Sequence, residues 1–144
     1  MPHFMPTKYS IEIVGESKYQ KAIKEISLYK DLVDKNDLEF HWDKFTAQLV
    51  LEDNNKFDPG NAVRVDIEGQ TVGYLDKDTA QLYRKALAKL GPIDEACTCK
   101  AAVHGKRYDS GKSMKLGIWL FIEPNRGLEI EPPKPPRKKL FGIF

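Results

Sequence analysis

A segment rich in asparagine, aspartate, proline and glycine interrupts the chain between two stretches that alternate apolar and polar residues. It runs from Glu52 to Ala62, between Ala47–Leu51 and Val63–Ile67. Because these residue types favour turns and end β-strands, the segment predicts a loop between two strands. A hairpin needs only about two to five residues for its connection. This loop is therefore longer than the closing of a hairpin requires.

Within this loop an aromatic residue, Phe57, directly precedes a carboxylate, Asp58. Two interpretations are open. In the first, the Asn and Asp side chains bind the loop's own backbone and Phe57 enters the core. In the second, the ring and the carboxylate form a small binding site. Composition alone favours the first interpretation.

Alternating, β-rich stretches predict six strands along the chain. They are Tyr9–Val14, Phe45–Leu51, Ala62–Glu68, Thr71–Leu75, Ala96–His104 and Met114–Ile122. Leu38–Trp42 fits either a short extra strand or an irregular lead-in. Gly73 lies inside one of the strands, which indicates a bulge or a close approach of another backbone segment.

Apolar residues at helical spacing predict two helices, Glu16–Val33 with Ser17 as N-cap and Thr79–Leu90 with Asp76 or Asp78 as N-cap. The resulting order β-α-β-β-β-α-β-β predicts a mainly β fold with two helices. Its hairpin connections favour a small six-stranded antiparallel barrel with helices packed at its openings. An open α+β sandwich is the alternative.

Composition changes near residue 124. Pro132–Pro136 is typical of an extended polyproline spacer, and it leads to the basic-apolar end Lys138–Phe144. We expect a lead-in over residues 1–8, a barrel domain over 9–123 and a flexible tail over 124–144. Lys138–Phe144 fits a peptide that docks on a protein partner, a segment that folds back on the domain, or a weak contact with a membrane surface.

The 144 residues are 41% hydrophobic and 31% charged, the usual balance of one globular domain. No apolar run approaches the roughly 18–20 residues of a membrane span. The first eight residues lack an apolar signal core, so we expect a cytoplasmic protein without a membrane partner. The last sixteen residues hold four basic and two acidic residues, which leaves 19 of each in positions 1–128. A neutral body is not typical of a protein that coats long duplex DNA.

No catalytic pattern is present. Cys97 and Cys99 fit small buried residues of a reduced protein, and the three histidines are scattered singly, so we expect no metal and no cofactor. Gly111–Ser113 matches only the end of a phosphate-binding loop. A metal-dependent nuclease could in principle use Asp53 and Asp58, but two acids in such a loop are mostly turn formers. We therefore expect a non-catalytic binding protein.

The loop and the strand pair after it resemble a known family. Asp53–Val65, followed by Gly69–Leu75 and Ala80, is similar to the HIRAN domain. That family typically shows Asn-Pro-Tyr-Asp-x-Asn-Ala-Ile/Val-x-Val, then Val-Gly-Tyr/His-Leu, then Ala near the start of a helix. Relative to this pattern, Gly60 is one additional residue. The resemblance spans roughly residues 9–122.

The resemblance implies an OB/SH3-like barrel and single-stranded DNA as the partner. Helicase-linked HIRAN domains hold the terminal nucleotides of a 3′ end between aromatic rings, while a loop carboxylate accepts a hydrogen bond from the 3′-hydroxyl. By this resemblance Phe57 and Tyr19 are the stacking rings and Asp58 is the hydroxyl acceptor.

Five further residues complete the candidate site. The resemblance implies that Asn55 contacts base or sugar, that Lys77 contacts phosphate and that Tyr74 lies near the DNA backbone. Lys18 stands beside Tyr19, and the loop around Lys106 adds Tyr108 from its composition alone. The function predicted from these residues is single-stranded DNA binding with a preference for a free 3′ end. The alternative is a protein-interaction module that acts through Lys138–Phe144.

Overall fold

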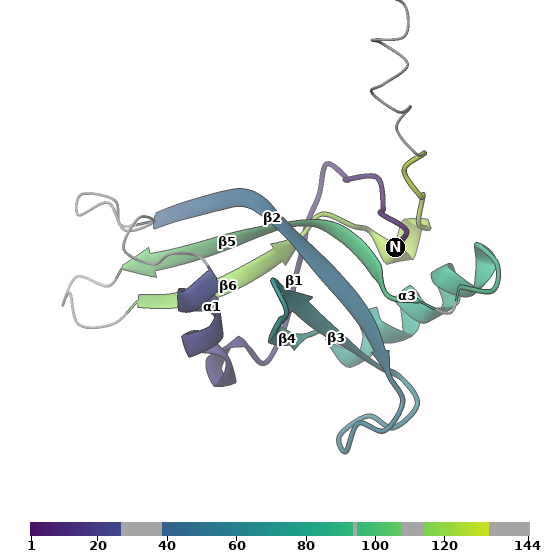
Figure 1. Cartoon of the computed structure of the whole chain (residues 1–144), viewed down its shortest axis with the longest axis horizontal. Helices are drawn as coiled ribbons and strands as arrows, with labels where there is room; N and C mark the ends of the chain where they lie inside the picture. The colour runs from purple at the N-terminus through teal and green to yellow at the C-terminus, as the bar shows by residue number, and fades with distance from the viewer. Residues whose placement is uncertain (27–38, 94, 108–113, 133–144) are drawn as a thin grey trace, which may run out of the picture.

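One antiparallel sheet of six strands organises the chain (Figure 1). The computed structural model describes residues 1–26, 39–93, 95–107 and 114–132. Its strands are β1 (Ile11–Glu12), β2 (Glu39–Glu52), β3 (Ala62–Ile67), β4 (Gln70–Tyr74), β5 (Cys97–Arg107) and β6 (Met114–Leu120). Its helices are α1 (Gln20–Ile26) and α3 (Lys77–Lys89), with 3-10 turns η1 (Glu16–Lys18) and η2 (Pro124–Arg126). The predicted mainly β fold with two helices is confirmed.

The sheet is strongly curled, and its two edges meet. Its strand order is β1-β6-β5-β2-β3-β4, and every neighbouring pair is antiparallel. Just after β1, Val14 N donates to Tyr74 O at 2.7 Å, and Tyr74 N donates to Val14 O at 2.9 Å. This bridge joins the first and last strands of the sheet. The predicted small six-stranded barrel-like fold is therefore confirmed over the open sandwich.

Gly73 permits this closure. A Cβ atom at this position would lie 2.6 Å from the carbonyl oxygen of Val14 and 2.7 Å from Cδ1 of Ile13. Both distances are shorter than a van der Waals contact, so any side chain here would push the two edges apart. The pairing of β3 with β4 also shifts register between Val65 and Asp66. The bulge and the close approach predicted for this glycine both occur.

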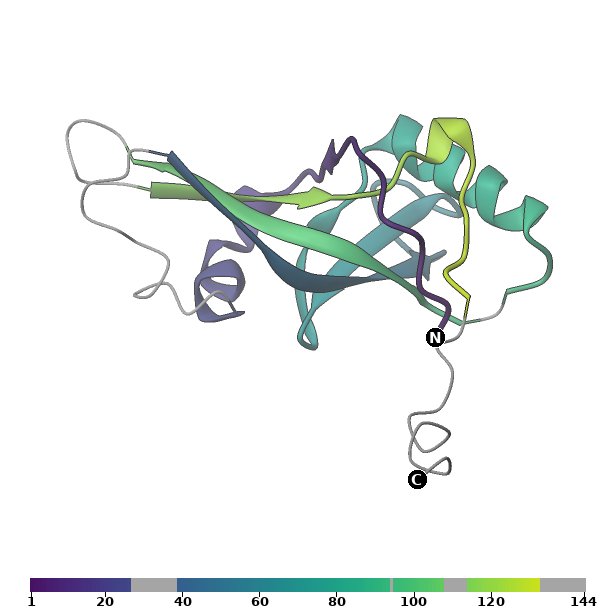
Figure 2. The same ribbon diagram turned by 90° about the horizontal axis from the view of Figure 1, so that it is seen from above.

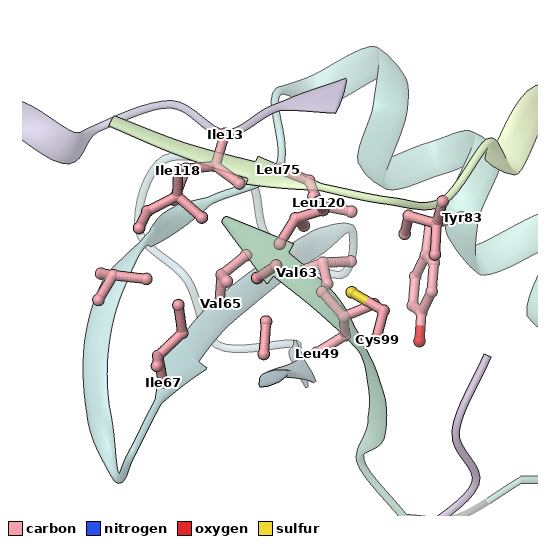
Figure 3. Packing of buried hydrophobic residues seen from close by; sticks show 14 of the residues in the cluster. Ile13, Leu49, Val63, Val65, Ile67, Leu75, Tyr83, Cys99, Ile118 and Leu120 are labelled. Atoms are coloured by element: carbon pink, nitrogen blue, oxygen red, sulfur yellow. The ribbon is translucent and has the colours of Figure 1, made fainter. Parts of the chain in front are cut away.

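Alternate residues of the curled strands fill the core (Figure 3). Helix α3 adds Ala80, Tyr83 and Leu87, which recur at helical spacing, whereas Leu90 at the end of the helix is 37% exposed. Cys97 and Cys99 are free thiols in this core, and burial raises the pKa of Cys99 to about 12. The predicted burial of both cysteines is confirmed.

Several boundaries differ from the predicted ones. Strand β2 begins at Glu39, so most of Leu38–Trp42 extends it, with a bulge between Trp42 and Phe45. The first helix begins at Gln20, because Gly15 has a φ of 81° and starts the separate turn η1. Ser17 lies inside that turn, so its prediction as the helix N-cap was wrong. Residues 27–33 of the predicted helix lie outside the described residues.

The two ends of the described chain pack together, as Figure 2 shows for the purple and yellow segments. Phe4 is buried and meets the Tyr83 ring edge-on, with centroids 5.9 Å apart. Met5 N donates to Glu129 O at 2.8 Å, and Glu131 N donates to His3 O at 2.7 Å. The packed structure therefore extends beyond the predicted limits of 9–123. The tail segment Lys138–Phe144 lies outside the described residues.

A substitution at the closure should separate steric exclusion from backbone strain. Gly73→Ala should lower the free energy of unfolding by about 1–3 kcal/mol more than Gly69→Ala, as overpacking of a well-filled site does. Gly69 is the matched control, because it also has a positive φ but its Cβ position is open. Urea denaturation of both variants measures the difference. Equal losses in the two variants would contradict a steric role for Gly73.

Candidate functional site

A pocket of about 260 Å³ opens where the two edges of the sheet meet. Three segments form it: the corner between β1 and α1, the loop between β2 and β3, and the junction of β4 with α3. We call it the seam pocket. It is lined by Val14, Gly15, Lys18, Tyr19, Asn55, Phe57, Asp58, Ala62, Tyr74, Leu75, Asp76 and Lys77. Seven of the eight predicted site residues are among these, and Tyr108 lies outside the described residues.

The loop between β2 and β3 is a structured turn that nevertheless exposes its aromatic ring. Asn55 Oδ1 accepts hydrogen bonds from Phe57 N at 2.8 Å and from Asp58 N at 3.0 Å. The Phe57 side chain is 75% exposed. The first interpretation of the loop was right about the Asn side chain but wrong about the burial of Phe57. The turn holds the ring out over the pocket.

The hydrogen bonds of the Asn55 side chain mostly stabilise the loop itself. Besides its two backbone contacts, its Nδ2 donates to Glu52 Oε1 at 2.9 Å. An asparagine amide has two N–H groups and one oxygen, so one N–H group remains for a ligand. The contact to base or sugar implied by the resemblance is limited to that single donor.

Glu52, a residue absent from the predicted site, links the loop to β4. Its Oε1 also accepts from the Tyr74 hydroxyl at 2.9 Å, and its Oε2 accepts from Arg64 Nη1 at 3.2 Å. Hydrogen bonds from Asn55, Tyr74 and Arg64 hold the pKa of Glu52 below its usual value of 4.5. Burial, together with the Glu52 carboxylate, raises the pKa of Tyr74 to about 12. The Tyr74 hydroxyl is therefore neutral and already used as a donor.

Arg84 of α3 clamps the other end of the loop. Its Nε and Nη2 donate to the carbonyls of Asn61 and Ala62 at 2.9 and 2.7 Å. Its Nη1 donates to Asp53 Oδ1 at 2.9 Å. Asp53 is thus held by an arginine at the loop end, while Asp58 lines the pocket. Among the described residues, no group of three or more His, Cys, Asp or Glu side chains is arranged to hold a metal ion.

Gly60, the additional residue of the loop, lies in a turn that leaves Asp58 in the pocket wall. Its φ is 78°, its N donates to Asp53 O at 2.9 Å, and its Cβ position is open. Within the described chain, the Asp58 carboxylate has one long contact, 3.5 Å from Asn61 Nδ2. The carboxylate therefore keeps most of its capacity to accept hydrogen bonds.

Of the remaining polar residues of the pocket, Asp76 stabilises a helix, whereas the two lysines can contact a ligand. Asp76 caps α3, with Oδ1 accepting from Thr79 N at 2.8 Å and Oδ2 accepting from Thr79 Oγ1 at 2.9 Å. This selects Asp76 over Asp78 as the N-cap. Lys18 Nζ lies 5.3 Å from the centroid of the Phe57 ring, a cation–π contact that joins the corner to the loop. Lys77 begins α3 at the pocket wall.

No protein-family model, curated protein or solved structure matches this chain. Within the described residues, no helix has the length and apolar character to cross a membrane.

Removal of the Glu52 charge should weaken the fold in a pH-dependent way. Because the folded state lowers the pKa of Glu52, its carboxylate stabilises the protein above the unfolded value near 4.5, and this contribution is lost as pH falls through the folded value. Glu52→Gln should lower the free energy of unfolding at pH 7 by about 1.5–3 kcal/mol, as for hydrogen bonds to a charged group. Urea denaturation at pH 7 and pH 4 measures this loss, which should shrink at pH 4.

The matched control is Glu25→Gln, on the exposed face of α1. It should leave the free energy of unfolding within about 0.5 kcal/mol of the parent at both pH values. An equal loss for Glu52→Gln at pH 7 and pH 4 would contradict the charged network.

Proposed function

We propose that this chain is a HIRAN-type module that binds single-stranded DNA at a free 3′ end and performs no catalysis. The observation that carries this proposal is the composition of the seam pocket. Two aromatic rings, Tyr19 and Phe57, come from different segments and line the same pocket as the carboxylate of Asp58. Lys18 and Lys77 line it as well.

Stacking on Phe57 supplies the sequence-independent part of this binding. A largely exposed ring offers its face to a base, and stacking of one base on an aromatic side chain contributes about 1–3 kcal/mol. Lysines beside the rings meet the phosphates of the same strand. This combination of rings and cations is the usual chemistry of single-strand recognition.

Asp58 accounts for the preference for a strand end. A carboxylate accepts hydrogen bonds from a terminal hydroxyl and repels a terminal phosphate. Glu52 and Asp76 are occupied by hydrogen bonds within the protein, whereas Asp58 keeps its accepting capacity. Among the described residues, the pocket thus offers a single available carboxylate. A single carboxylate suits recognition of a hydroxyl group, whereas a hydrolase that uses acid–base catalysis would need a pair of acids.

The chemistry of the strand end should decide affinity. A short oligonucleotide with a 3′-hydroxyl should bind about tenfold or more tightly than the same strand with a 3′-phosphate, since a hydrogen bond to a charged group contributes about 1.5–3 kcal/mol. Fluorescence anisotropy with strands labelled at the 5′ end measures both affinities. Asp58→Asn should reduce this ratio by weakening binding of the hydroxyl end. If the parent protein binds the 3′-hydroxyl strand and the 3′-phosphate strand with equal affinity, Asp58 does not recognise the 3′-hydroxyl.

The Phe57 ring should contribute to binding but not to stability. Phe57→Leu should weaken binding of a 3′-hydroxyl strand by about 1–3 kcal/mol, because it removes the stacking face and keeps an apolar side chain. Its free energy of unfolding should stay within about 0.5 kcal/mol of the parent, since the ring is exposed. Leu82→Ala, at an exposed position of α3 outside the pocket, is the control. It should change the binding free energy and the free energy of unfolding by no more than about 0.5 kcal/mol each. Unchanged affinity of Phe57→Leu for DNA would argue against stacking at the seam pocket.

A further inference from the structure

The outer face of the sheet begins at the rim of the seam pocket. Ile13 is buried in the core, so Glu12 and Val14 on either side of it point outward. Val14 lines the pocket and is 43% exposed. Glu12 stands beside Trp119 of β6 in the strand register. Val14 at the pocket and Glu12 beside Trp119 are two residues apart, so the outer face is continuous from the pocket to Trp119.

The Trp119 ring of β6 packs face-on against the His104 ring of β5. Their rings are stacked, with centroids 4.3 Å apart and an interplanar angle of 19°. His104 Nε2 lies 2.7 Å from Glu12 Oε2, which fixes the imidazole from the side of β1. Gly117 pairs with His104 across the strands, and a Cβ there would lie 2.5 Å from Nε2. Only a glycine lets the imidazole lie against the sheet at this position.

A second ring follows on the same face. Leu120 is fully buried, so Trp119 and Phe121 both point outward, about 7 Å apart along the chain. Lys100 Nζ lies 5.3 Å from the centroid of the Phe121 ring. Lys100 also lines a hollow of about 450 Å³ on this side, together with Lys44 and Phe45. We call His104, Trp119, Lys100 and Phe121 the outer strip.

We propose that the outer strip is a second binding surface for single-stranded DNA, which takes the nucleotides that precede the end held in the seam pocket. This inference rests on the proposed function of that pocket. The occupant follows from the chemistry of the strip: two rings on one face, each in contact with a cationic or imidazole side chain. Bases stack on such rings while lysines meet phosphates. The Glu12 carboxylate, which would repel phosphate, is bound to His104.

The strip predicts that affinity depends on strand length. Oligothymidylates of two, four, eight and twelve nucleotides, all with a 3′-hydroxyl, should bind more tightly as they lengthen until the strip is covered. Trp119→Ala should weaken binding of the twelve-nucleotide strand about fivefold or more and leave the two-nucleotide strand unchanged. Each phosphate that the strip neutralises should add about 0.7 to the negative slope of log affinity against log salt concentration.

Two further measurements keep the proposal testable if Trp119→Ala does not fold. Lys100→Glu should weaken the binding of long strands only. Lys89→Glu, at the exposed far end of α3, is the control, and any effect that it has on binding should be equal for long and short strands. The chain has two tryptophans, so Trp42→Phe leaves Trp119 as the sole tryptophan reporter. Its fluorescence should change with the twelve-nucleotide strand and not with the two-nucleotide strand.

The outcomes separate this inference from the proposed function. If Phe57→Leu weakens the two-nucleotide strand but long strands bind no more tightly than short ones, the strip is overturned and the pocket stands. The same holds if Trp119 fluorescence does not respond to long strands. If no strand of any length binds, or Phe57→Leu changes nothing, the pocket fails and the strip fails with it.

Discussion

The backbone bridge between Val14 and Tyr74 is the contact on which both the fold and the site depend. It joins the first and last strands of the curled sheet through two hydrogen bonds, and it forms only because Gly73 has no side chain. The same bridge brings the corner after β1 next to the start of α3. The seam pocket is therefore a consequence of how the sheet closes, and a change that opens the barrel would also separate the walls of the pocket.

Hydrogen bonds within the protein decide which pocket groups are available to a ligand. Glu52 holds Asn55 and Tyr74, Arg84 holds the loop end, and Asp76 caps α3. Each of these polar groups satisfies another, as buried and half-buried polar groups must. What remains toward the pocket is the rings of Tyr19 and Phe57, the Asp58 carboxylate and the lysines, and the proposed binding of single-stranded DNA rests on these groups.

Much of the fold could be predicted from local patterns, whereas most of the site was predicted from the resemblance to a known family. Alternation located the strands, and the resemblance named residues in all three walls of the pocket, at Tyr19, Phe57 and Tyr74. Local patterns did not identify Glu52 or Arg84, because a carboxylate at the end of a strand and an arginine on a helix look like ordinary surface residues. Their roles arise from partners as far as 22 positions away for Glu52 and 31 positions away for Arg84. The Ser17 cap was wrong because the preceding glycine starts a separate turn.

The amino-acid sequence by itself determined the strand and helix content and the turn residues of the loop. These depend on local backbone preferences and on the spacing of apolar residues, which act over a few neighbouring positions. Tertiary structure decided that Phe57 is exposed, that Gly60 leaves Asp58 in the pocket wall, and that residues 3–5 pack against 129–131. These outcomes depend on which distant segments meet when the sheet closes, and such long-range contacts are not encoded in any single stretch of the chain.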